Sequence, residues 1–217
     1  MRNPFDRYVS IFEFGVNPSG WRYNPYAEEK AIRQEFPNFP DLNFDEYLRL
    51  ENRFGLWGRP YHDILQADIG LLTFQFIQMF FRNPKKTFRI FNEEYIDSTR
   101  YKEDMPEIIF LRMENLNHDL YHILLKFGYA VEDISFILNA EKIHVKSTTK
   151  LWEEYYTEDL IQYVSYKERF LFRLFPEYAV SPPAPLSKGV KGRVKEWFRN
   201  WYRGERGNKL FWVDGVK

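Results

Sequence analysis

The sequence contains no cysteine among its 217 residues and no long hydrophobic run. The first absence excludes disulfide frameworks and metal sites built from thiolates. The most apolar stretch, residues 69–81, is interrupted by polar residues, and at about 13 residues it is shorter than the ~20 with which a helix spans a bilayer. Residues 1–4 also lack the apolar segment of a signal peptide. We therefore expect a soluble, cytoplasmic protein without a membrane-spanning helix.

Apolar side chains are nevertheless plentiful: hydrophobic residues make up 44% of the sequence and aromatic residues 19%. Such a composition provides enough apolar surface for a buried core, which argues against a disordered chain. The length suits one large domain or two small ones. A proline-rich stretch, residues 181–185, divides the chain into a body, residues 1–180, and a C-terminal segment, residues 181–217.

Helical signals dominate the body. Asn3 followed by Pro4 predicts a helix near the N-terminus, because asparagine caps the first turn and proline suits the first helical position. Asn43, with Glu46 three residues later, has the spacing of a capping box. The predicted helices cover residues 3–14, 43 onward, 69–81, 117–126, 131–138 and 158–174, while residues 82–107 give no clear prediction.

Residues 108–111 (IIFL) form a short apolar run that is typical of a β-strand. A strand needs neighbours to satisfy its backbone N–H and C=O groups, and the sequence offers few other candidates. The sequence pattern therefore predicts a mainly helical α/β fold with part of its sheet missing.

Residues 2–10 (RNPFDRYVS) carry the clearest chemical signal. An arginine directly before a capped helix N-terminus forms an anion site, because the backbone N–H groups and the helix dipole favour negative charge and a guanidinium can hold two phosphate oxygens. Arg2 supplies that guanidinium, and Ser10 adds a hydroxyl further along. The alternative is an ordinary helix cap with Arg2 in solvent.

This nonapeptide resembles the 3'-phosphate-binding motif of sulfotransferases that use PAPS (3'-phosphoadenosine 5'-phosphosulfate) as donor. An arginine, an Asn-Pro step and a serine recur there in this order, so the resemblance assigns Arg2 and Ser10 to the 3'-phosphate. Further segments are similar to carbohydrate-type members of the family, in the family's order: residues 43–48, 110–120 and 153–178. The resemblance implies a P-loop-like α/β fold with a parallel sheet, PAPS as donor substrate, no metal and a carbohydrate hydroxyl as acceptor.

One part of the family's site has no counterpart in the sequence. These enzymes hold the sulfate end of PAPS with a Pro-Lys-Thr-Gly type loop, whose glycines expose backbone N–H groups and whose lysine stabilises negative charge. Residues 83–87 (NPKKT) contain no glycine, and residues 187–193 lie at the wrong end of the chain. We therefore expect the C-terminal portion of a sulfotransferase fold, with the first strand and the phosphate loop missing, and no activity from this chain alone.

Several other residues are candidates for a role in the same reaction. His62 is the candidate catalytic base, and the alternative is a loop histidine bonded to its neighbour Asp63. The resemblance places Lys146, Thr148 and Lys150 near the donor, although a solvated turn explains these residues equally well.

Two further features of residues 110–126 have alternative interpretations. Glu114 either faces the nucleotide or simply favours the dipole of the helix that follows it. His118 and His122 have a spacing compatible with metal binding, but no third ligand is evident, so a packed or solvated helix face is favoured.

The C-terminal segment is basic and amphipathic. Residues 188–209 contain eight Lys or Arg and two Glu, with aromatic and aliphatic residues at helical spacing. Such a helix either docks on the body or makes a peripheral contact with an anionic membrane. A nucleic-acid partner is not expected, because the basic residues form one short stripe without a recognised binding module.

Three functions follow from these observations. The first is sulfuryl transfer from PAPS to a carbohydrate hydroxyl, in which catalysis works by positioning and charge neutralisation. The second is a non-catalytic domain that binds a nucleotide or a glycan. The third is a membrane-surface interaction protein that acts through residues 188–209.

Overall fold

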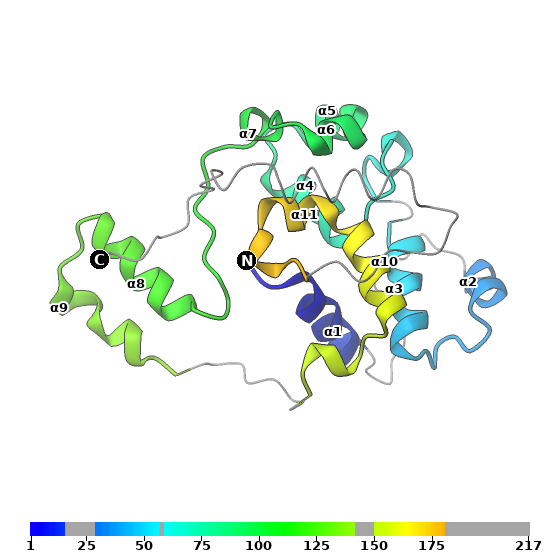
Figure 1. Cartoon of the computed structure of the whole chain (residues 1–217), viewed down its shortest axis with the longest axis horizontal. Coiled ribbons are helices and arrows are strands. Elements are labelled where there is room, and N and C mark those ends of the chain that lie inside the picture. Colours follow the sequence, from blue (N-terminus) through cyan, green and yellow to red (C-terminus); the bar gives the residue numbers. More distant parts are fainter. Residues whose placement is uncertain (16–28, 57–58, 142–149, 181–217) are drawn as a thin grey trace.

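The computed structural model describes residues 1–15, 29–56, 59–141 and 150–180. Within these ranges the chain forms eleven α-helices, a few short 3₁₀ helices and no strand (Figure 1). The α-helices are α1 (Pro4–Gly15), α2 (Glu29–Glu35), α3 (Phe44–Arg53), α4 (Leu71–Phe80), α5 (Pro84–Ile90), α6 (Glu93–Asp97), α7 (Tyr101–Asp104), α8 (Leu116–Lys126), α9 (Val131–Ile134), α10 (Glu158–Lys167) and α11 (Arg169–Leu174). The 3₁₀ helices are η1 (His62–Ile64), η2 (Ser135–Asn139), η3 (Trp152–Glu154) and η4 (Pro176–Tyr178).

The predicted α/β fold is wrong, and the described residues contain no parallel sheet. Residues 106–112 belong neither to a helix nor to a strand. Ile108 and Phe110 pack against the helical core, where the Phe110 ring lies 5.2 Å from the ring of Phe175. A run that buries alternate side chains against helices has the same hydrophobic pattern as a strand, and this explains the error.

The helix predictions were more successful where a cap marks the start. The side chain of Asn43 accepts a hydrogen bond from the Glu46 N–H, and the Glu46 side chain accepts one from the Asn43 N–H, so the capping box at the start of α3 is confirmed. The apolar stretch 69–81 forms α4, and α8 ends shortly before Gly128, whose φ is 86°. That left-handed backbone favours glycine.

Several helical regions differ from their predictions. Residues 131–138 were expected to form one helix but form the short α9 followed by the 3₁₀ helix η2. Residues 158–174 were expected to form one helix but break into α10 and α11 at Glu168, whose side chain turns into the core. Residues 82–107, which gave no prediction, form the short helices α5, α6 and α7.

The main core gathers aromatic rings from both ends of the described chain. Phe5 of α1 stacks on Trp152 at 4.7 Å and on Phe172 at 5.3 Å between ring centroids. Phe170 and Phe175, on and just after α11, meet Phe76 of α4. A smaller cluster joins α2 to α3. Phe5 thus packs α1 on η3 and α11, and α1 also contacts α3, while α8 and α9 stand at one side of the body (Figure 1).

No helix in the described part of the chain is long and apolar enough to cross a membrane.

Candidate anion site on helix α1

Helix α1 presents two chemically different faces. Phe5, Tyr8 and Val9 are buried, and their spacing places them on one side of the helix. Asn3, Arg7 and Ser10 share the opposite side, because positions three, four and seven residues apart lie close together around a helix. The polar residues of the sequence motif therefore lie on the outward face of a helix whose inner face is fixed in the core.

The start of α1 has the cap that the sequence predicts. The side-chain oxygen of Asn3 accepts a hydrogen bond from the Phe5 N–H at 3.0 Å, and the Asn3 carbonyl accepts one from the Arg7 N–H at 2.9 Å. Pro4 occupies the first helical position. Arg2 immediately precedes this capped terminus, where the helix dipole favours negative charge.

A second cation, Arg7, joins Arg2. Although the residue as a whole is exposed, burial of its guanidinium and the positive charge of Arg2 both lower the pKa of Arg7. The ion pairs of the described residues include neither arginine. Two neighbouring cations without a carboxylate partner repel one another, and a bound anion would relieve that repulsion.

Ser10 lies on the same face but deeper along the helix. It follows Asn3 by two turns, which is about 10 Å along the axis. A phosphate that touches the Ser10 hydroxyl must therefore lie alongside the first turns of α1, next to Arg7, with Arg2 reaching back to it. Asp6 also lies in the first turn, and its negative charge opposes an anion there.

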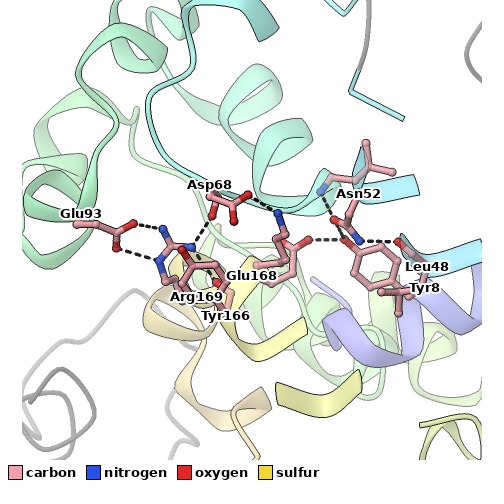
Figure 2. Close-up of polar contacts among 10 residues, drawn as sticks. Tyr8, Leu48, Asn52, Asp68, Glu93, Tyr166, Glu168 and Arg169 are labelled. Atoms are coloured by element: carbon pink, nitrogen blue, oxygen red, sulfur yellow. Dashed lines mark hydrogen bonds and ion pairs between the residues drawn. The ribbon is translucent and has the colours of Figure 1, made fainter. Parts of the chain in front are cut away.

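A buried polar cluster anchors α1 from behind (Figure 2). The Tyr8 hydroxyl lies 2.5 Å from Oε1 of Glu168 and 2.9 Å from Oδ1 of Asn52. Glu168 in turn caps α4: Oε2 accepts hydrogen bonds from the Thr73 N–H at 2.7 Å and from the Thr73 hydroxyl at 2.6 Å. The cluster therefore ties α1, α3 and α4 to the junction of α10 and α11.

The complete burial of Tyr8 and Glu168 indicates a structural role for this cluster. Burial raises the pKa of Glu168, although the hydrogen bonds from Thr73 and Tyr8 act in the opposite direction. Burial and the nearby Glu168 carboxylate also raise the pKa of Tyr8. Both groups are fully enclosed, so they hold α1 in position and are not accessible to a substrate.

An ion pair between the buried Arg169 and the exposed Glu93 lies beside this cluster. Arg169 is 3% exposed, and its guanidinium bonds Glu93 of α6 and the carbonyl of Asp68 at 2.7 Å (Figure 2). It also bonds the Tyr166 carbonyl at 2.8 Å. With all these partners, Arg169 joins α11 to α6 and is not available to a ligand.

The other predicted donor-binding residues are not gathered at the start of α1. The Lys150 ammonium lies over the Tyr155 ring at 5.7 Å, and the Tyr155 hydroxyl donates to Glu13 near the opposite end of the helix. Lys150 is therefore closer to the C-terminal half of α1 than to Arg2. Lys146 and Thr148 lie outside the described residues.

His62 is likewise placed away from this site. It begins η1, directly after Tyr61, whose ring lies 5.9 Å from Phe88 of α5. The preceding Pro60 carbonyl accepts a hydrogen bond from Gln78 of α4. These contacts place His62 beside α4 and α5, and none of them brings it to Arg2.

Residues 111–119 meet both ends of the described chain. The Met113 N–H donates to the Met1 carbonyl at 2.8 Å, and the Met1 ammonium donates to the Leu111 carbonyl. Glu114 accepts a hydrogen bond from the Tyr178 hydroxyl at 2.9 Å. Burial, followed by this hydrogen bond, raises the pKa of Tyr178. Glu114 thus has a structural partner, and the contact places it close to Met1 and so to Arg2.

Sequence reasoning missed Arg7 as a member of the site. The residue is part of the motif, and its spacing of three from Ser10 was the signal that could have identified it. Comparison of the chain with family models, curated proteins and solved structures gave no match. The assignment of a function therefore rests on the motif residues and on the geometry of α1.

Proposed function

We propose that the chain binds the 3'-phosphate of PAPS, or of its product PAP (3'-phosphoadenosine 5'-phosphate), on the outward face of α1 and serves sulfuryl transfer to a carbohydrate hydroxyl. The observation that carries the proposal is the pairing of Arg2 and Arg7 at a capped helix N-terminus without an ion-pair partner among the described residues. The order of the similar segments, residues 2–10, 43–48, 110–120 and 153–178, supports the class of donor.

Each residue has a defined part in this binding. Arg2 and Arg7 offer guanidinium N–H groups, which hold phosphate oxygens in a planar, bidentate fashion. The Ser10 hydroxyl donates to a further oxygen. The core contacts of Phe5 and Tyr8 fix the helix before the ligand arrives, so little order is lost on binding.

The reaction itself transfers the sulfuryl group from PAPS to the acceptor oxygen. The bond between sulfur and the bridging oxygen of the 5'-phosphate breaks, a new sulfur–oxygen bond forms, and the acceptor proton passes to a base. His62, the base predicted from the sequence, lies beside α4 and α5 and not at this site. We therefore propose that this chain binds the 3'-phosphate and that turnover needs additional catalytic groups.

A titration with PAP followed by calorimetry tests the proposal. We expect Arg2→Ala to weaken binding at least tenfold, which corresponds to about 1.4 kcal/mol. Arg89→Ala is the matched control, because Arg89 is an exposed arginine on α5 and its removal changes the net charge equally. Equal PAP affinities for wild type and Arg2→Ala, with both folded by circular dichroism, would refute the proposal.

The membrane alternative, with a peripheral contact through residues 188–209, falls outside the described residues and stays a prediction. Replacing Trp197 and Trp201 by alanine tests it, since loss of liposome binding would support the contact. Cytoplasmic location also stays a prediction from the sequence.

A further inference from the structure

Helix α8 carries a pair of histidines that the anion site does not use. His118 and His122 are spaced one turn apart, so both rings project from the same face of the helix. Their Nε2 atoms lie 3.0 Å apart, and the ring centroids are separated by 4.2 Å with an interplanar angle of 67°. His118 is exposed and His122 is half-buried, so an ion in solvent can reach both nitrogens.

The separation of the two nitrogens matches two ligands on a single metal ion. Zinc and its neighbours bind imidazole nitrogen at about 2.0–2.1 Å. Two nitrogens 3.0 Å apart then subtend an angle of about 94° at the metal, since half their separation is 1.5 Å. This angle suits neighbouring positions of square-planar or octahedral coordination, and it is narrower than a tetrahedral angle of about 109°.

Packing of α8 against its neighbours fixes the backbone that carries His118 and His122. Ile123, next to His122, is buried, and α8 packs against η2. The Asn117 side chain donates to the Ala140 carbonyl at 2.8 Å, which ties the start of α8 to the end of η2. The Tyr121 ring contacts the His122 ring edge to face at 5.5 Å. Both imidazoles are thus carried by a fixed backbone, and binding a metal orders only their side-chain torsions.

Among the residues that the structure describes, no third ligand adjoins the two histidines. Asp119 lies between the two histidines in sequence, but its carboxylate is 3% exposed and holds the Arg112 guanidinium at 2.7 Å and 2.9 Å. No group of three or more His, Cys, Asp or Glu that could enclose a metal occurs among the described residues. Water or an external ligand would therefore complete the coordination.

We propose that His118 and His122 form an open, two-nitrogen chelate for a divalent transition metal of the Cu²⁺ or Ni²⁺ type. Both metals favour nitrogen ligands in neighbouring square-planar or octahedral positions. The two imidazoles bind through Nε2, and the metal keeps exchangeable positions towards solvent.

Titration of the untagged full chain with Ni²⁺ tests the proposal. We expect one Ni²⁺ ion per chain and an affinity that falls at least tenfold in both His118→Gln and His122→Gln. Glutamine is a better helix former than histidine, so neither change at this surface should unfold α8. His62→Gln is the control, because it removes a histidine that lies beside α4 and α5 and outside α8, and it should leave Ni²⁺ affinity unchanged.

Cu²⁺ provides a second, structural readout. The electron paramagnetic resonance spectrum of the Cu²⁺ complex should show coupling to two imidazole nitrogens in the wild type and to fewer in either single variant. Equal Ni²⁺ affinity in the wild type and both variants would overturn the chelate. An equal loss in His62→Gln would also overturn it, because scattered surface groups would then be responsible for binding.

Discussion

Replacing Gly70 by alanine tests how tightly the buried cluster behind α1 is packed. Gly70 precedes α4 and has φ of −85°, a backbone conformation that alanine adopts without strain. By its effect on the unfolded chain alone, the substitution should stabilise the protein by about 0.4–1 kcal/mol. The packing around Gly70 predicts the opposite effect, a loss of stability.

The packing argument follows from the space around Gly70. A Cβ atom added there would lie 2.6 Å from Cδ of Glu168 and 2.8 Å from Oδ1 of Asn52, and still closer to Oε1 of Glu168. Glu168 is fully buried, so its carboxylate would have to withdraw and break its bonds to Thr73 and Tyr8. Leaving such groups without partners costs about 1–3 kcal/mol each. We expect Gly70→Ala to lower the free energy of unfolding by about 3–5 kcal/mol.

Urea unfolding followed by circular dichroism measures this loss, and Gly128→Ala is the control. Gly128 has φ of 86° with nothing within 4 Å of an added Cβ, so alanine there meets only backbone strain of about 1–2 kcal/mol. In a chain that already carries Glu168→Ala, the nearer obstacle is gone and only Oδ1 of Asn52 remains, so Gly70→Ala should cost at least about 2 kcal/mol less than in the wild type. If Gly70→Ala costs less than Gly128→Ala, the packing argument is wrong.

Three further predictions concern Glu168, Asp6 and the missing phosphate loop. Because burial raises the pKa of Glu168 above its unfolded value, the contribution of Glu168 to stability is complete below about pH 4.5 and falls as the pH rises through the folded pKa. Glu168→Gln should therefore lose more unfolding free energy at pH 4.5 than at pH 7, and a loss that grows with pH would contradict the assignment. Asp6→Asn removes a negative charge from the first turn of α1 and should strengthen PAP binding about two- to fivefold at low salt, whereas weaker binding would place the phosphate elsewhere. The purified chain should transfer no labelled sulfate from PAPS above a boiled control, since its sequence has no Pro-Lys-Thr-Gly type loop; transfer above that control would show that other groups hold the 5'-phosphosulfate.

The sequence predicted the elements whose ends carry a local signal. Asn3 with Pro4 and the Asn43–Glu46 box are short-range patterns, and both helices begin where these patterns place them. Asn83 and Asn92 cap α5 and α6 in the same way, by accepting hydrogen bonds from the backbone N–H groups of Lys86 and Tyr95. Those caps were visible in the sequence too, but helices of five to seven residues show too little periodicity to be recognised.

The features that the sequence did not predict depend on contacts between residues far apart in the chain. Within the strand-like run 108–111, the Phe110 ring packs on Phe76 and Phe175, which lie far away in the sequence. The break at Glu168 depends on Tyr8, 160 positions earlier, and on the N-terminus of α4. In the candidate site, Arg2 and Ser10 were identified from the motif, whereas the place of Lys150 beside Tyr155 needed the folded chain.

The most direct test of the proposed function compares PAP with adenosine 5'-phosphate, which differs from PAP only in lacking the 3'-phosphate. If Arg2, Arg7 and Ser10 hold that phosphate, the chain binds PAP at least tenfold more tightly than adenosine 5'-phosphate, a preference of about 1.4 kcal/mol. The preference should vanish in Arg2→Ala and persist in Arg89→Ala. Equal affinity of the wild-type chain for the two nucleotides would contradict the assignment of α1 as a 3'-phosphate site.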